Sequence, residues 1–363
     1  MRIEHVELYA VDLRLVTTHE NALARYDTTR DVFVRLVTDE GLVGYGATAP
    51  KPYISGETQE TVVAVLRALL IPAVQGLDPS CPAAIHRAME AAVVGNPAAK
   101  AAIDLACYDV TGKALGVPAY QLLGGAYRLS QDAFDLIDLW SPERAAEEAG
   151  RLAAQGVTQI KVKVGKDLQG DLERVRAVRK AAPMATLKVD ANQQWGGKRA
   201  LQIIPRLEEI GVAVVEQPVP AYDVEGMARV RAGVSCAIMA DESVKTDRDA
   251  WRLLSAGVVD ALNVKISKVG GLWPAQRIVT LAQAAGIPCQ AGCTLENSLV
   301  DAAAAHLFAS QPNVIWNEIK APQWIVDDVA HGLKVEGGLV YVPVQPGLGL
   351  EIDEERLARF RVG

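Results

Sequence analysis

The sequence is short of positive charge, regularly spaced cysteines and long apolar runs, and each shortage excludes a class of protein. It has 37 lysine and arginine residues against 44 aspartate and glutamate residues, and the net charge of −7 argues against nucleic acid or an anionic membrane as partner. No run is long and apolar enough to span a bilayer, and the opening MRIEHVELYA is predicted to form a strand instead of a signal peptide. Five cysteines without regular spacing offer no zinc site, so we expect a protein of the reducing cytoplasm.

Low-complexity segments are absent too, and 363 residues, 50% of them hydrophobic, are enough for a large core. That length suits one large barrel with a smaller domain, or two ordinary domains. The first part has the pattern of a small α+β domain. Its strand-like runs DVFVRLVT and LVGYGAT are joined by Asp39-Glu40-Gly41, a hairpin signal, and helical patterns follow at about 58–70 and 97–115.

From about residue 130, short β-rich runs alternate with amphipathic helices, which predicts a parallel sheet. Charged residues end successive runs at steps of 27, 26, 25 and 24 residues, and the last lies 53 residues further on. These residues are Lys163, Asp190, Glu216, Asp241, Lys265 and Glu318. Such a step fits one strand, one helix and two short loops. Eight such strands would close into a barrel whose active site lies at the carboxyl ends of the strands.

Three acidic residues, Asp190, Glu216 and Asp241, would end consecutive strands, so their carboxylates can converge. Clustered carboxylates repel one another unless a cation neutralises them, and oxygen ligands suit Mg²⁺ or Mn²⁺. The alternative is that these carboxylates form ion pairs with lysines across the barrel, which carries a desolvation penalty for both charges. We favour the metal.

Lysines supply the predicted acid/base groups. Lys161 and Lys163 are two residues apart on one strand and therefore point to the same face, and Lys265 faces them from the opposite side of the barrel. A metal between two such lysines could hold a substrate carboxylate and stabilise the enediolate formed when the α-proton leaves. Lys268, three residues after Lys265, is interpreted as a rim residue.

Histidine is scarce, and none of the five histidines ends a predicted barrel strand, so a histidine-based acid/base mechanism is disfavoured. His19 lies between the first two predicted strands, in the segment VTTHENALARYDTTR. We expect it in a loop, where it could contact substrate.

Taken together, these motifs resemble the enolase superfamily and, within it, the muconate lactonizing enzyme (muconate cycloisomerase) subgroup. The likeness covers nearly the whole chain: GNPAAKAAIDLACYDVTGKALGVPAYQLLGG comes before the barrel, and VDANQQW, EQPV, IMADES, KISKVGG and PGLGLEIDEERLARF follow. The resemblance implies an α/β fold, a modified TIM barrel of the (β/α)7β type. The barrel would occupy 126–339, and an α+β capping domain would occupy 1–125, with the tail 340–363 returning to it.

The resemblance also implies residue roles. Lys163 and Lys265 would be catalytic, and Asp190, Glu216 and Asp241 would bind Mg²⁺ or Mn²⁺. A cap loop at about 16–30 and a turn at 53–56 would close over a small carboxylate substrate. The residues expected to contact that substrate are Lys161, Glu318, Asn192, Tyr53 and His19. Family habit indicates a homo-oligomer.

Several functions share this chemistry, which is metal-dependent removal or addition of a proton α to a carboxylate. The leading hypothesis is an isomerase that lactonizes cis,cis-muconate or a related dicarboxylate. The second is a racemase or epimerase of N-acylamino acids, dipeptides or proline derivatives, because two opposed lysines suffice for 1,1-proton transfer. Dipeptide epimerases carry paired aspartates on strand eight, which IWNEIKAP lacks.

Three departures from the family pattern concern the substrate more than the chemistry. Ala47 stands where a glutamate is usual, strand seven (AGCTLENS) matches only in part, and strand one (DAFDLIDLW) lacks the expected tryptophan pattern. An acid dehydratase therefore stays open. A barrel that only binds a small acid is disfavoured, because none of the three metal ligands or two catalytic lysines is missing.

Overall fold

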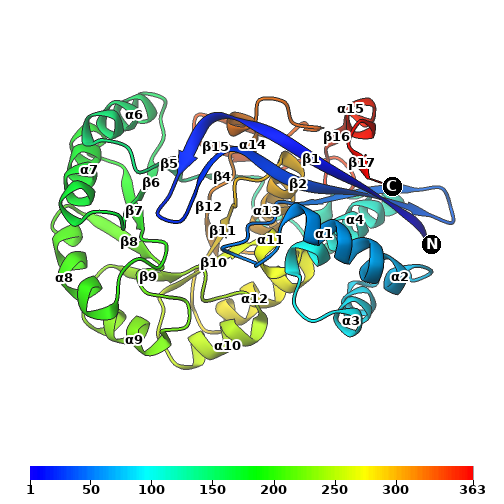
Figure 1. Ribbon diagram of the computed structural model, residues 1–363, viewed down its shortest axis with the longest axis horizontal. Helices are drawn as coiled ribbons and strands as arrows, with labels where there is room; N and C mark the ends of the chain where they lie inside the picture. The colour runs from blue at the N-terminus through cyan, green and yellow to red at the C-terminus, as the bar shows by residue number, and fades with distance from the viewer. Residues whose placement is uncertain (363) are drawn as a thin grey trace.

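The computed structural model describes residues 1–362 and has two parts, a barrel and a cap (Figure 1). The barrel contains an eight-stranded parallel sheet, and the cap is built on a four-stranded antiparallel sheet. Both chain termini lie at the cap end of the molecule, far from the barrel helices (Figure 1). The predicted fold class, a modified (β/α)7β barrel with an α+β cap, is confirmed. Within these residues no helix is both long and apolar enough to cross a bilayer.

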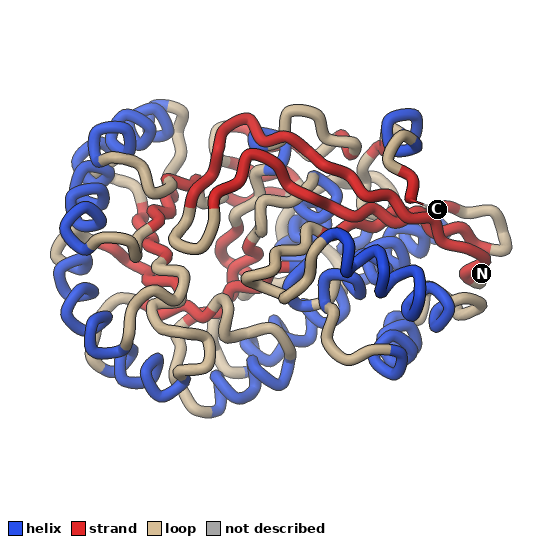
Figure 2. The backbone as a smooth tube through the Cα atoms, in the orientation of Figure 1, coloured by secondary structure: helices blue, strands red, loops and turns tan. Residues whose placement is uncertain are grey.

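The cap sheet has the order β17-β1-β2-β3, and its two long strands form a hairpin that reaches from the cap across to the barrel (Figure 2). Its strands are β1 (Ile3–Glu20), β2 (Arg25–Thr38), β3 (Val43–Thr48) and β17 (Arg361–Val362). The prediction of a loop at about 16–30 is therefore wrong. Only residues 21–24 form the turn, and Glu20 pairs with Arg25. The β-branched residues on both sides of this turn favour strand, and the hairpin ladder continues through them.

Helices cover the cap sheet. They are α1 (Gln59–Val65), the π-helical turn η1 (Leu66–Leu70), α2 (Ile71–Val74), α3 (Pro82–Ala92), α4 (Pro97–Leu115) and α5 (Ala119–Leu122). The helices predicted at 58–70 and 97–115 are thus confirmed. Most of α4 is buried, and it approaches β3 so closely that a Cβ at Gly46 would meet the carbonyl oxygen of Ala102. Glycine at this position permits the contact.

The barrel strands follow one another in sequence order around the sheet. They are β5 (Asp135–Ile137), β6 (Gln159–Lys163), β7 (Thr186–Asp190), β8 (Val212–Glu216), β9 (Ala237–Ala240), β10 (Ala261–Lys265), β11 (Cys289–Gly292) and β12 (Val314–Asn317). Ala133, two residues before β5, forms a parallel bridge with Asn317 at the end of β12. This bridge links the first strand of the barrel sheet to the last. The register places Lys163 beside Asp190 and Asp190 beside Glu216, so the charged ends are level.

Seven helices of nine or more residues connect the eight strands: α6 (Pro142–Ala154), α7 (Leu168–Ala181), α8 (Gly197–Glu208), α9 (Val224–Ala232), α10 (Asp247–Ser255), α12 (Leu272–Ala284) and α13 (Ser298–Ser310). Alternation along β6 shows how this packing builds the site. Ile160 and Val162 are buried in the core shared with the helices, so Lys161 and Lys163 point to the barrel interior.

Short elements complete the chain: α11 (Ile266–Val269), α14 (Ala321–Trp324), α15 (Glu354–Ala358), β4 (Ser130–Asp132), β13 (Ala330–His331), β14 (Lys334–Glu336), β15 (Leu339–Tyr341) and β16 (Glu351–Ile352). Strand β17, in the tail, pairs with β1 at Leu8 and Tyr9. The predicted division at residues 125 and 339 stays a proposal.

Candidate active site

Two inward lysines of β6 meet carboxylates from β7, from β8 and from the residue that follows β12. The Nζ of Lys163 lies 2.6 Å from Asp190 Oδ2 and donates to the side-chain oxygen of Asn192 at 3.1 Å. The Nζ of Lys161 lies 3.0 Å from Asp190 Oδ2, 3.0 Å from Glu216 Oε2 and 2.8 Å from Glu318 Oε1. All six of these side chains are buried, so the ion pairs among them are shielded from solvent.

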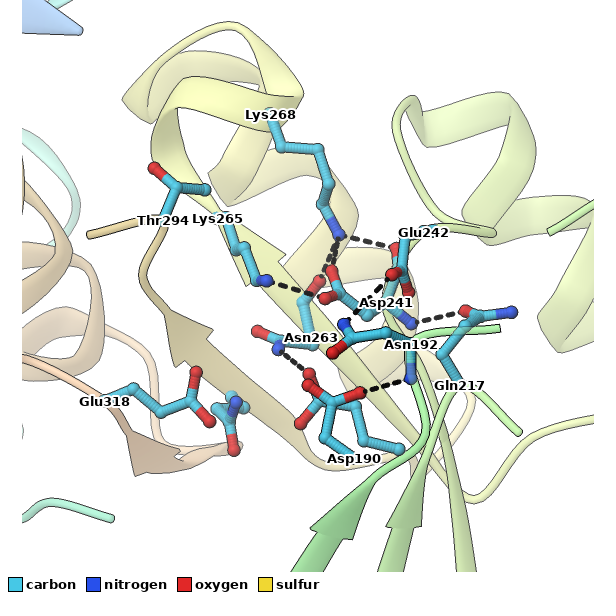
Figure 3. Close-up of polar contacts among 12 residues, drawn as sticks. Asp190, Asn192, Gln217, Asp241, Glu242, Asn263, Lys265, Lys268, Thr294 and Glu318 are labelled. Atoms are coloured by element: carbon cyan, nitrogen blue, oxygen red, sulfur yellow. Dashed lines mark hydrogen bonds and ion pairs between the residues drawn. The ribbon is translucent and has the colours of Figure 1, made fainter. Parts of the chain in front are cut away.

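A second group of charges lies across the barrel, where Lys265 and Lys268 both contact Asp241 (Figure 3). The Nζ of Lys265 is 2.6 Å from Asp241 Oδ2, and that of Lys268 is 2.6 Å from Oδ1. The interpretation of Lys268 as a rim residue is wrong, because its relative exposure is only 1%. The one-turn helix α11 follows β10 directly and turns this side chain inward, where it also donates to the carbonyl oxygens of Asp241 and Asn263.

Lys188 is a site residue that sequence reasoning missed. It is fully buried, and its Nζ lies 2.9 Å from Glu216 Oε2 and 2.7 Å from Glu318 Oε1. The signal was present, since Lys188 precedes Asp190 by two residues on one strand and must point to the same face. Asn263 was missed as well, and its amide donates to Glu216 Oε1 at 2.8 Å.

The electrostatics keep these groups charged despite burial. Burial opposes the charge on Lys161, but the carboxylates of Asp190, Glu216 and Glu318 outweigh it and hold the Lys161 pKa well above its usual value. Burial likewise favours neutral Glu216, yet Lys161 and Lys188 hold its pKa well below the usual value. The site is therefore a network of ionised pairs.

The same balance applies across the barrel. Burial disfavours the charge on Asp241, and Lys265 and Lys268 more than compensate, so the Asp241 pKa is lowered. Within residues 1–362 the next residue, Glu242, is hydrogen-bonded by Asn192 and forms no ion pair with a lysine. Burial and the neighbouring charges of Asp241 and Asp190 raise the pKa of Glu242 to about 7.

The three predicted metal ligands sit at consecutive strand ends but are engaged by lysines. Within residues 1–362 no three ligand-type side chains stand close enough to hold a metal ion in this arrangement. The structure thus shows the lysine pairing that the sequence left as the alternative. The donor set nevertheless fits a hard divalent cation, because Asp190, Glu216 and Asp241 are buried, oxygen-only ligands whose charges already need cationic partners.

A cavity adjoins this network and is lined by residues of both the barrel and the cap. Its lining includes both predicted catalytic lysines and every residue expected to contact substrate: Lys163, Lys265, Lys161, Glu318, Asn192, Tyr53 and His19. His19 belongs to β1 and not to a loop, because the hairpin ladder extends to Glu20. The structure therefore brings all these residues to one cavity, while their roles stay proposals.

Comparison with known proteins agrees with this architecture. Residues 5–124 match the model of the mandelate racemase / muconate lactonizing enzyme N-terminal domain, and residues 144–356 match the enolase C-terminal domain-like model. The chain belongs to this family of the enolase superfamily. It is an isomerase of the mandelate racemase/muconate lactonizing enzyme group, whose shared chemistry is proton abstraction.

Similar proteins of the family divide between two activities. An N-succinyl-L-Arg/Lys racemase from Bacillus cereus is 33% identical over 100% of this chain and 98% of its own length, and its crystal structure gives a TM-score of 0.97. A dipeptide epimerase from Enterococcus faecalis, solved with Mg and L-Leu-L-Tyr, is 35% identical, with a TM-score of 0.93 over 97% of this chain and 100% of its own. Muconate cycloisomerase 1 from Rhodococcus opacus is 32% identical over 97% of this chain and 96% of its length.

Proposed function

We propose that this enzyme is a racemase or epimerase that inverts the α-carbon of an N-acylated amino acid. The observation that carries the proposal is the placement of Lys163 and Lys265. They end β6 and β10, which are four strands apart in an eight-stranded barrel, and both line the same cavity. Two bases on opposite walls can act on opposite faces of one carbon, as inversion requires.

The residues divide the reaction between them. One lysine, as a neutral amine, takes the α-proton, and the other, as an ammonium, delivers a proton to the opposite face. Lys161, held among carboxylates, positions the substrate carboxylate beside Lys163. Bound by Asp190, Glu216 and Asp241, Mg²⁺ or Mn²⁺ would supply positive charge that stabilises the negative charge developing on the substrate.

The eighth strand supports an acylated substrate over one with a free α-ammonium. A free ammonium needs a carboxylate, and the segment after β12 offers Glu318, which already pairs with Lys161 and Lys188. Lys320, two residues on, is itself a cation and pairs with Asp135 at 2.7 Å. A neutral amide nitrogen makes no such demand on the site.

The cycloisomerase predicted first is the second candidate. The 32% identity with muconate cycloisomerase 1 over 97% of this chain favours it. Lactonization needs one proton donor, however, and leaves the second lysine without a proton to move. The racemase uses both lysines, and the Bacillus cereus and Enterococcus faecalis relatives support it. Assembly into a homo-oligomer stays a prediction.

Proton NMR in D₂O with Mg²⁺ or Mn²⁺ tests the proposal, with a panel of N-acylamino acids, N-acylprolines, dipeptides and cis,cis-muconate. We expect deuterium to enter the α-position of both enantiomers of an N-acylamino acid, and EDTA to stop the exchange until metal is restored. A deuterated lactone from muconate, with the amino acids untouched, would establish the cycloisomerase instead.

Single-lysine variants give the sharper result. Lys163→Ala should abolish exchange from one enantiomer and Lys265→Ala from the other, because each lysine serves one face. Lys180→Ala, which removes an exposed lysine on α7 outside the barrel, is the matched control and should exchange both enantiomers normally. Exchange of both enantiomers by both active-site variants would refute the assignment.

A further inference from the structure

The chain leaves two of the predicted metal ligands through residues whose backbone conformation favours glycine. Five non-glycine residues among 1–362 have a φ in the left-handed region, and three of them are Asn192 (42°), Gln193 (70°) and Gln217 (38°). Each of these three follows Asp190 or Glu216 by three residues or fewer. This conformation costs energy for a residue with a Cβ, and it persists only where the surrounding structure holds it in place. At Gln217 the side chain shows what holds it.

The fully buried side chain of Gln217 makes four hydrogen bonds, which tie the end of β8 to the end of β9. Its Oε1 accepts from the backbone N–H of Asp241 at 2.9 Å (Figure 3) and from that of Ser243 at 3.2 Å. Its Nε2 donates to the carbonyl oxygen of Val219 at 2.9 Å and to Ser243 Oγ at 2.7 Å. Because the two backbone N–H groups can only donate, the amide oxygen must face them, and the side chain is held in one orientation.

The backbone of Gln217 extends this link to the third predicted ligand. Its N–H donates to a carbonyl oxygen of β9 at 2.9 Å, and its own carbonyl oxygen accepts from the N–H of Gln193 at 2.9 Å. Gln193 follows Asp190 by three residues, Asp241 is bound through its amide, and Glu216 precedes Gln217 in the chain. The main chains that carry all three predicted metal ligands are therefore joined through one residue.

We propose that Gln217 is a positioning residue for the metal centre, and that it holds the Asp241 main chain beside Glu216 so that both carboxylates can bind one divalent cation. Gln217 is not among the residues of 1–362 that line the catalytic cavity, so it has no part in proton transfer or substrate contact. Mg²⁺ demands a near-ideal arrangement of its oxygen ligands, and hydrogen bonds around the ligands supply that arrangement. Gln217 has this role only if the three carboxylates bind metal, which is part of the proposed function. A racemase and a cycloisomerase would need it equally.

Mn²⁺ binding to the metal-free enzyme, measured by titration calorimetry and by the EPR signal of free Mn²⁺, tests this role without turnover. Gln217→Met fills a similar volume but removes all four hydrogen bonds. We expect its Kd for Mn²⁺ to rise about 10- to 100-fold, which is the scale for loss of an outer hydrogen-bond partner of a metal site. Gln217→Gly also removes the side chain but adopts a φ of 38° without strain, so it carries the same test should Gln217→Met fail to fold.

The matched control is Gln59→Met in the cap. Gln59 is also a buried glutamine, and its Nε2 donates to the carbonyl oxygens of Val11 and Asp31. Both methionine variants lose buried hydrogen bonds, so both should show a lower Tm than the unmodified enzyme in the absence of metal. Only Gln217→Met should bind Mn²⁺ more weakly, and this split separates a positioning role from a contribution to stability alone.

The binding results also separate the role of Gln217 from the proposed function. An unchanged Kd in both Gln217 variants, with a lowered Tm, would overturn the positioning role and leave the proposed function standing. Failure of the unmodified enzyme to bind Mn²⁺ would overturn the positioning role together with the metal part of the proposed function. Weaker binding confined to the Gln217 variants, with no α-deuteration of any N-acylamino acid by the unmodified enzyme, would uphold the positioning role and overturn the racemase.

Discussion

His306 gives the enzyme a defined sensitivity to acid. It lies on α13, fully buried, where its Nδ1 accepts from the backbone N–H of Tyr120 and its Nε2 donates to the carbonyl oxygen of Leu348. These contacts join the barrel to the end of the cap and to the tail. Burial lowers the pKa of His306 to about 4.

The sign of the effect follows from proton uptake. An unfolded chain protonates this histidine below about pH 6.5, whereas the folded protein keeps it neutral down to about pH 4. The contribution of neutral His306 to stability is therefore complete above about pH 6.5 and is lost as the pH falls toward 4. Between pH 7 and pH 5 the loss amounts to about 2 kcal/mol. For a chain of this length that is about 2 to 3 °C in Tm.

Thermal denaturation of the unmodified enzyme and of His306→Gln, at pH 7 and pH 5, measures the pH-dependent contribution of His306 to stability. Glutamine does not titrate, so all other pH-dependent groups act equally in both proteins. We expect the Tm advantage of the unmodified enzyme to shrink by about 2 to 3 °C on acidification. His331→Gln, at an exposed position, is the control. An advantage of equal size at both pH values would refute the reasoning.

Two further predictions concern the packing of the site and of the cap, and thermal denaturation checks both. Lys268→Met removes a buried ammonium from Asp241 and should cost about 3 to 5 kcal/mol, so an unchanged Tm would contradict the ion pair. Gly46→Ala places a methyl group against the carbonyl of Ala102 and should cost at least about 1 to 3 kcal/mol. Gly150→Ala, in α6 with open space around it, should instead stabilise by about 0.5 to 1 kcal/mol, and equal effects of the two alanines would contradict the close approach.

The strand ends could be predicted from sequence because they depend on local periodicity alone. A step near 26 residues places a charged residue at each carboxyl end, and the parallel register then brings Lys163, Asp190 and Glu216 level without further information. Lys188 could have been found from the alternation of side chains along β7, where it lies two residues before Asp190. Lys268 could not be found in this way, since its burial depends on one helical turn immediately after β10, where the strand period no longer applies.

The sequence offered pairing of acids with lysines as an alternative, but the individual partners could not be predicted, because they depend on which strands face one another. Lys161 contacts carboxylates 29, 55 and 157 residues further along the chain, and only the closed barrel brings these to one ammonium. Desolvation alone would disfavour such pairing. In the closed barrel the neighbouring charges oppose this penalty, holding the pKa of Lys161 above its usual value and those of Glu216 and Asp241 below theirs.

Substrate choice was the hardest feature to predict, and the hairpin shows why. Between Arg14 and His19 the β1–β2 ladder shifts register, so His19 pairs with Tyr26. No residue pattern in the segment marks that irregularity, yet it sets the position along the hairpin of His19, whose Nδ1 lies 2.9 Å from Asp138 Oδ2. The predicted catalytic lysines lie on barrel strands whose geometry repeats, whereas His19, which is predicted to contact substrate, lies where the cap sheet departs from regularity. A sequence therefore predicts proton transfer better than it predicts the molecule whose proton is moved.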